Sequence, residues 1–93
     1  MHVLLVTLDL EIPGAFSLKD KRSVIKGIQA RIRQRHNAAI AEVDHQDKWN
    51  RATLALVTVA TLESTVESVM RQIEEELEAN FDVVVLGFER EWL

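Results

Sequence analysis

The order of apolar and polar positions at the start of the chain predicts a strand followed by a helix. Residues 3–12 are apolar and partly β-branched and then alternate with charged residues, which is typical of a strand. A Pro-Gly turn ends this strand, and Ser17 can then cap a helix that carries Asp20 in its first turn. Leucine and isoleucine recur at helical spacing behind the cap, so we expect the first helix over about residues 18–35.

The second half of the chain predicts another amphipathic helix. Ser64 and Glu67 have the spacing of a capping box, in which each side chain bonds the other residue's backbone N–H group. Apolar residues then recur at i, i+3, i+4, i+7 and i+11 from Val66, which places them on one face of a helix. We expect this helix to close near Asn80.

Three further stretches have the composition of strands. The pattern over residues 38–45 is weak, and a polar connection over 47–50 separates it from a β-branched strand over 52–60. The last strand begins at 81, runs to about 88 and can continue to Trp92. The resulting order, β-α-β-β-α-β, predicts an α+β plait of the ferredoxin-like class. Such a fold has a four-stranded antiparallel sheet with both helices on one face, the first and third strands being central.

The first and last strands are apolar on both sides, although a single-layer sheet usually carries polar residues on its open face. Apolar residues occupy both alternating sets of positions in segments 3–8 and 83–86. Two explanations are open. The sheet can tolerate some exposed aliphatic side chains, or a second copy of the chain covers the open face as a homodimer. The second explanation describes an oligomeric module for protein interaction or regulation.

Length and composition exclude several classes of protein. The 93 residues have the length of one domain, and we expect a single domain over residues 1–93. The absence of cysteine excludes disulfides, thiolate catalysis and cysteine-ligated metal sites. The apolar runs are far shorter than the roughly 20 residues of a membrane span, and the N-terminus lacks the basic leader of a signal peptide. We therefore expect a cytoplasmic protein with no membrane contact, and nothing in the sequence indicates a cofactor.

Charge is segregated along the chain, which carries a net charge of −4. Segment 17–36 holds seven basic residues and one acidic residue, whereas segment 63–82 holds seven acidic residues and one basic residue. An anionic partner should prefer the first segment, so we predict an electrostatic contact with RNA or a ribosomal assembly through the first helix. The alternative is an ordinary solvated face. The predicted contact residues are Lys19, Lys21, Arg22, Lys26, Arg31, Arg33 and Arg35.

The segment from Glu42 to Asp47 concentrates carboxylates around an imidazole. Such groups can bind a divalent metal or transfer protons. On a strand, however, Asp44 and His45 point to opposite faces, and no nucleophile or second ligand cluster accompanies them. We therefore predict no catalytic residue and no metal site, and we expect a hydrogen-bonding network at the end of the strand.

The remaining candidate features are weaker. The loop over 12–16 precedes a helix N-terminus that could accept an anion, but its single glycine is too little for a phosphate-binding loop. Trp49 and Trp92 can mark an interface or fill the edge of a core. The central strands, 3–10 and 52–60, contain no aromatic residue, so base stacking on the sheet, as in RNA-recognition domains, is not expected.

Two motifs give the chain a family resemblance over essentially its whole length. Ser17-Leu-Lys-Asp-Lys-Arg22 and Glu42-Val-Asp-His-Gln-Asp47, with Trp49 shortly after, resemble the YlxP-like bacterial family of unknown function. The resemblance implies a ferredoxin-like fold and, because genes of that family commonly lie among those for translation factors, a translation-related or ribosome-associated role. It supplies no catalytic residues. The matching positions of unknown role are Ser17, Asp20, Glu42, Asp44, His45, Gln46, Asp47 and Trp49.

Overall fold

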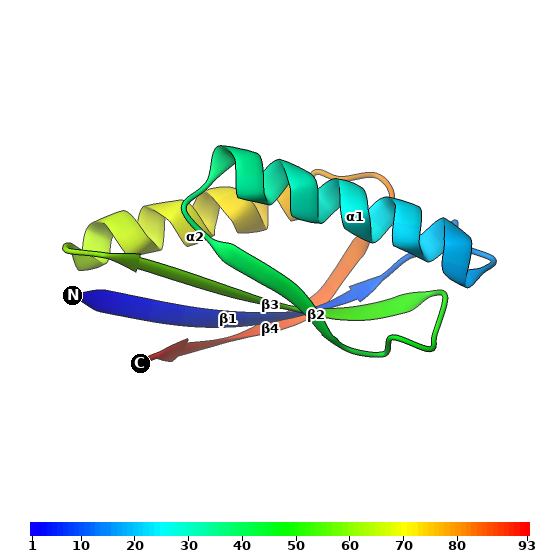
Figure 1. Cartoon of the computed structure of the whole chain (residues 1–93), viewed down its shortest axis with the longest axis horizontal. Coiled ribbons are helices and arrows are strands. Elements are labelled where there is room, and N and C mark those ends of the chain that lie inside the picture. The colour runs from blue at the N-terminus through cyan, green and yellow to red at the C-terminus, as the bar shows by residue number, and fades with distance from the viewer.

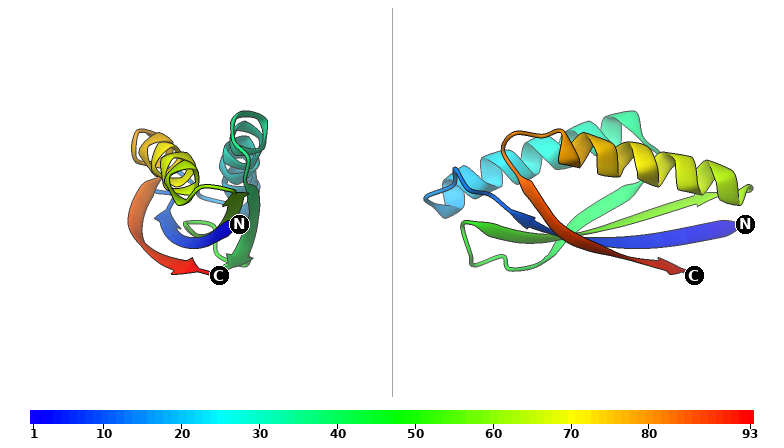
Figure 2. Two further views of the ribbon diagram at one scale, coloured as in Figure 1. Left: turned by 90° about the vertical axis from the view of Figure 1, so that its left-hand side faces the viewer. Right: turned by 180° about the vertical axis from the view of Figure 1, so that it is seen from behind.

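The computed structural model describes all 93 residues and confirms the predicted order of strands and helices. The strands form one antiparallel sheet in the order β2-β3-β1-β4, and both helices lie side by side on one face of it (Figures 1 and 2). Neither helix is long and apolar enough to span a membrane. The elements are β1 (His2–Glu11), α1 (Leu18–Arg35), β2 (Ala39–Asp44), β3 (Arg51–Ala60), α2 (Glu63–Glu78) and β4 (Val84–Trp92).

Strand alternation determines which residues of the sheet face the helices. Leu8 of β1 lies between Leu54 of β3 and Phe88 of β4, and the positions two residues away on β1 are buried in the same way. The alternate positions of β1 and β3 face away from the helices. Register shifts interrupt the pairing of β1 with β4 after Asp9 and that of β2 with β3 after Glu42.

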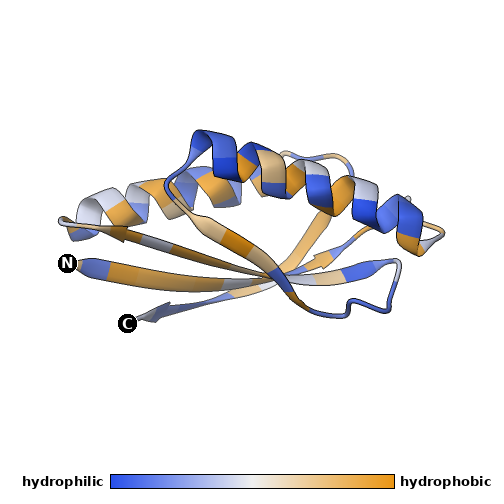
Figure 3. Cartoon of the chain, viewed as in Figure 1, coloured by the Kyte–Doolittle hydropathy of each residue, from blue (hydrophilic) through white to orange (hydrophobic).

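The core lies between the sheet and the two helices and consists of aliphatic side chains and one methionine. Met70 of α2 is fully buried there, and Ile28 of α1 is almost as inaccessible. Figure 3 shows the hydrophobic residues of β1 beneath the helices and the hydrophilic end of β4. No aromatic residue belongs to this core, and all five aromatic side chains are exposed to solvent. The expectation that a tryptophan could fill a core edge is therefore wrong for both Trp49 and Trp92.

The two helices begin differently. Ser17 Oγ accepts a hydrogen bond from the Asp20 N–H at 3.1 Å, and Asp20 Oδ2 accepts one from the Phe16 N–H at 3.0 Å. The predicted cap of α1 is therefore confirmed, with Asp20 completing it. The predicted capping box of α2 is wrong, because Ser64 and Glu67 both lie inside that helix. Its N-cap is Leu62, which has no side-chain acceptor to offer.

Candidate nucleic-acid interface

The basic residues of α1 divide between two flanks of the helix. The buried stripe runs through Lys21, Ile25, Ile28 and Ile32, and at 3.6 residues per turn the remaining positions fall on either side of it. Arg31 and Arg35 lie on the flank that faces α2. The flank toward β2 carries four exposed cations over about 21 Å of helix, since 14 residues rise about 1.5 Å each. We call these four the basic row: Lys19, Arg22, Lys26 and Arg33.

No member of the basic row forms an ion pair. The ion pairs of the molecule join Lys21 to Glu42, Arg35 to Glu76, and Arg90 to Glu67, and the His36 ring forms a hydrogen bond with Glu76. Arg33 donates one hydrogen bond from Nη2 to the Ile40 carbonyl at 3.0 Å, which holds the end of the row against β2. The row therefore presents positive charge that no carboxylate of the chain neutralises.

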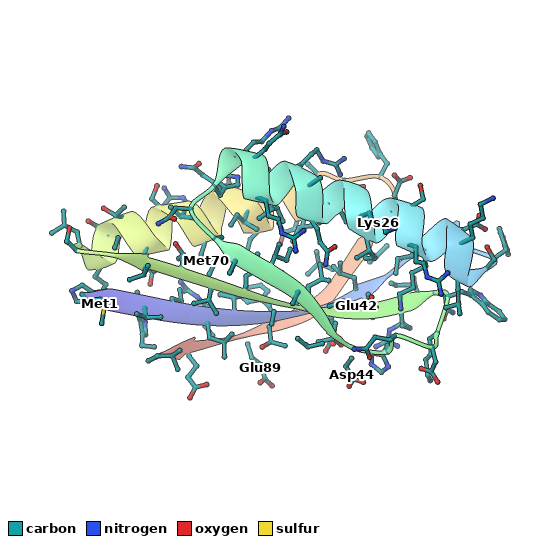
Figure 4. All side chains as sticks on the ribbon, viewed as in Figure 1. Met1, Lys26, Glu42, Asp44, Met70 and Glu89 are labelled. Carbon is teal, nitrogen blue, oxygen red and sulfur yellow. The ribbon has the colours of Figure 1, made fainter.

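Lys21 does not belong to the interface, and its inclusion among the contact residues was wrong. Only 2% of the side chain is exposed. Its Nζ atom lies 2.7 Å from Glu42 Oε2 and donates to the His45 carbonyl at 2.5 Å. Figure 4 shows Glu42 on β2 close beneath α1. The ammonium group therefore links the first turn of α1 to the end of β2, and in doing so brings the two sequence motifs together.

Three acidic residues of α2 lie at the opposite edge of the molecule. Glu67, Glu74 and Glu78 lie on the flank toward β4, and Glu67 Oε2 pairs with Arg90 at 2.5 Å. Burial raises the pKa of Glu74 above its ordinary value; Arg90 opposes this rise, whereas Glu78 and Glu67 add to it. Figure 2 shows α1 on the β2 side and α2 on the β4 side. An anion approaching the basic row from outside therefore does not meet this acidic flank.

Asp44 and His45 line the same hollow on the open face of the sheet, and the expectation that they point to opposite faces of a strand is wrong because His45 lies beyond the strand. The strand β2 ends at Asp44, and His45 adopts a left-handed φ of 61°. The His45 N–H donates to Asp44 Oδ1 at 2.8 Å, which confirms a hydrogen-bonded strand end. Figure 4 shows Asp44 and Glu89 on the side of the sheet away from the helices. The hollow, about 490 Å³, is lined by Thr7, Asp9, Asp44, His45, Thr53, Gly87, Phe88 and Glu89.

This open-face hollow combines residues from every strand and carries three carboxylates, those of Asp9, Asp44 and Glu89. Thr53 Oγ1 donates to Asp9 Oδ1 at 2.7 Å, so part of its polar lining is internally satisfied. No three carboxylate or imidazole side chains of the chain are arranged to hold a metal ion. Because its carboxylates repel phosphate groups, the hollow is not part of the candidate interface with nucleic acid.

A second hollow lies at the end of the molecule where α1 begins. It measures about 390 Å³ and lies between the loop that precedes α1 and the loop that joins β2 to β3. Phe16 and Trp49 line it and are both exposed. Sequence reasoning named Trp49 as a possible interface residue and named Phe16 only as the last residue of the loop before the first helix. Gln46 and Asp47 are exposed in the same β2–β3 loop.

Comparison with known proteins identifies relatives without assigning a function. Residues 3–90 match the family described as "Protein of unknown function (DUF503)". The uncharacterized protein YlxP of Bacillus subtilis (strain 168) is 32% identical over 62 residues, which is 67% of this chain and 67% of that protein. A de novo designed protein with a ferredoxin fold, solved by NMR, superposes with a TM-score of 0.57 at 18% identity. That match covers 99% of this chain and 85% of the designed chain, and it establishes the ferredoxin-like fold alone.

Proposed function

The chain belongs to the DUF503 family of proteins of unknown function, and we propose that it is a cytoplasmic, non-enzymatic accessory protein that binds RNA electrostatically through the basic row of α1. The observation that carries this proposal is the run of unpaired cations on the exposed flank of one helix. Lysine and arginine that neutralise phosphates release condensed counterions, which makes binding favourable, independent of sequence and sensitive to salt. RNA is favoured as the partner by the translation-related role that the family resemblance implies.

The separation of charge supports this function in a chain whose net charge is −4. A uniformly mixed surface of this charge repels RNA at long range. Here the basic row of α1 lies along one edge, and the acidic flank of α2 lies along the other. A phosphate within a Debye length of the basic row, about 8 Å, is attracted by its cations. The acidic flank lies at the opposite edge of the molecule, so salt screens its repulsion of the same phosphate.

A triple substitution tests the proposal. Lys19→Ala, Arg22→Ala and Lys26→Ala together remove three phosphate contacts, and a single-stranded RNA releases about 0.7 counterion per contact. The slope of log affinity against log salt should therefore fall by about 2, and affinity at about 0.1 M salt should fall by about 100-fold. Fluorescence anisotropy of a labelled RNA over a salt series measures both quantities.

A matched control is Arg71→Ala, which removes an exposed cation from α2 and should leave binding unchanged. Sedimentation of the tagged protein from native lysate supplies a second readout. Migration with a ribosomal subunit at low salt, lost at several-fold higher salt, supports the proposal. Equal RNA affinity of the triple variant and the wild type refutes the role of the basic row.

Self-association through the open face of the sheet is a second candidate function, and one observation favours it. Val3 and Leu5 of β1 lie opposite Val59 and Val57 of β3 on that face, which makes one half of it apolar. Val59 is 43% exposed, an unusual position for a valine in a central strand. Apolar burial against a second copy is not screened by salt as exposed charge is.

Light scattering at tens of micromolar protein tests this second candidate. We expect a mass of two chains for the wild type and of one chain for Leu5→Lys, which places a charge on the apolar half of the face. The Lys48→Ala variant, in the exposed β2–β3 loop, is the control and should keep the wild-type mass. A wild-type mass of one chain rejects self-association.

A further inference from the structure

We infer that the RNA bound by this protein is single-stranded, and that an unpaired base stacks in the hollow between Phe16 and Trp49. This inference rests on the proposed function and names the form of RNA that the same end of α1 accepts. Figure 1 shows that the start of α1 and the β2–β3 loop lie at the same end of the molecule, opposite both termini. The hollow is lined by Glu11, Pro13, Ala15, Phe16, Trp49 and Asn50.

Two large aromatic side chains are exposed to solvent at the same place on the surface. Phe16 is 81% exposed and Trp49 is 51% exposed, and neither belongs to the aliphatic core. Large aromatic side chains exposed together on loops are typical of positions that contact a partner. Every nucleobase has a π face, and stacking on aromatic side chains is the usual source of affinity for unpaired strands.

Hydrogen bonds hold the loop before α1 and the β2–β3 loop in place. The Ile12 N–H donates to the Asn50 carbonyl at 2.9 Å, which joins the loop before α1 to the β2–β3 loop. The Phe16 N–H donates to Asp20 Oδ2, and Lys21 Nζ donates to the His45 carbonyl. Each aromatic residue is thus carried by backbone that is tied to α1. A preorganised wall loses less conformational entropy on binding than a mobile loop does.

Positively charged side chains lie near the hollow on both sides. Lys19 and Arg22 follow Phe16 within the first turns of α1, and Lys48 precedes Trp49 in the chain. An RNA strand whose phosphates lie along the basic row therefore reaches the aromatic hollow at the N-terminal end of α1. Glu11 contributes a carboxylate to the lining, which repels a phosphate and can accept a hydrogen bond from a base amino group. The hollow can therefore bind an RNA base more readily than the phosphate backbone of the RNA.

The stacking proposed here differs from the stacking of bases in RNA-recognition domains. In those domains aromatic residues stand on the central strands of the sheet. Here the open face has an apolar half and an acidic hollow, and neither central strand contains an aromatic residue. The aromatic pair stands instead on two loops beside the helix N-terminus. A rigid duplex keeps its bases stacked internally, so only an unpaired base can enter this hollow.

The experiment compares a 12-nucleotide oligoadenylate RNA with an RNA hairpin that carries the same number of phosphates and whose loop is replaced by a polyethylene glycol linker, so that every base of the hairpin is paired. The wild type should bind the oligoadenylate more tightly. The Phe16→Ala/Trp49→Ala variant should lose about tenfold or more in affinity for oligoadenylate, keep its affinity for the hairpin and keep the wild-type salt slope. The control, Phe81→Ala/Trp92→Ala, removes two exposed aromatic residues elsewhere and should bind both RNAs as the wild type does.

A spectroscopic readout follows the stacked residue itself. In a Trp92→Phe background the remaining tryptophan is Trp49, and oligoadenylate should quench its fluorescence whereas the hairpin should not. If the aromatic variant binds oligoadenylate as the wild type does while the triple charge variant is weakened, stacking is wrong and the electrostatic function stands. If the wild type binds neither RNA at low salt, both the inference and the proposed function are overturned.

Discussion

Replacing Lys21 with alanine is expected to lower the free energy of unfolding by about 3–5 kcal/mol, the cost of breaking a buried ion pair by removing one partner. Lys21 is 2% exposed, whereas the side chain of its partner Glu42 is 22% exposed. The substitution therefore deletes a well-packed stem and leaves a largely buried carboxylate without its cation. It also removes the donor to the His45 carbonyl, which fixes the β2–β3 loop against α1.

Urea denaturation followed by circular dichroism measures this loss. The control is Lys19→Ala two residues earlier, where the side chain is exposed and unpaired and the expected change is within about 0.5 kcal/mol. A second variant, Glu42→Gln, keeps the volume and a hydrogen-bond acceptor for Lys21, so it should be less destabilising than Lys21→Ala. Equal stability of Lys21→Ala and Lys19→Ala would contradict the structural role of the ion pair.

Replacing Leu8 with alanine should lower the free energy of unfolding by about 3 kcal/mol, within the range for large-to-small changes in a core. Leu8 is fully buried in the central strand β1, between Leu54 and Phe88 of the neighbouring strands. The surrounding sheet and helices cannot collapse into the space without breaking the strand register. The lost packing therefore adds to the lost transfer free energy of the methyl groups.

The control for Leu8→Ala lies on the same strand. Leu5→Ala removes the same atoms from the open face, where the side chain is only partly buried, and should cost less than half as much in the monomer. Thermal and urea unfolding at low protein concentration compare the two variants. If Leu5→Ala is as destabilising as Leu8→Ala under these conditions, the open face is covered and contributes to the core.

The ion pair between Lys21 and Glu42 also explains part of the family resemblance. The two motifs that carry it, Ser17 to Arg22 and Glu42 to Asp47, come together at this pair. Ser17 and Asp20 cap α1, and Lys21 joins α1 to β2. Several of these positions therefore maintain the fold. Within the first motif, Lys19 and Arg22 are the cations that remain free to bind a partner.

The sequence by itself determined the order of the elements, the core face of each helix and the segregation of charge. The core face of each helix follows from the 3.6-residue spacing of apolar residues over α1 and α2, whereas the segregation of charge follows from the composition of two segments. The core face of β1 did not follow, because both alternating sets of its first positions are apolar. The cap of α1 was readable because its acceptor and donor lie three residues apart. The periodicity of α2 did not fix its first residue, and the helix begins at Glu63, one residue before the expected cap.

Only the tertiary structure decided which polar residues are buried and which side chains meet. Lys21 belongs to a strongly basic segment, yet it occupies a core position because Glu42 and the His45 carbonyl, more than 20 residues away, offset the cost of burying its charge. Phe16 and Trp49 share a hollow because antiparallel strands return the chain to the same end of the sheet. Such contacts depend on how distant strands pair and on where the strands end. Neither property produces a periodic pattern in the sequence, so these contacts could not be predicted from it.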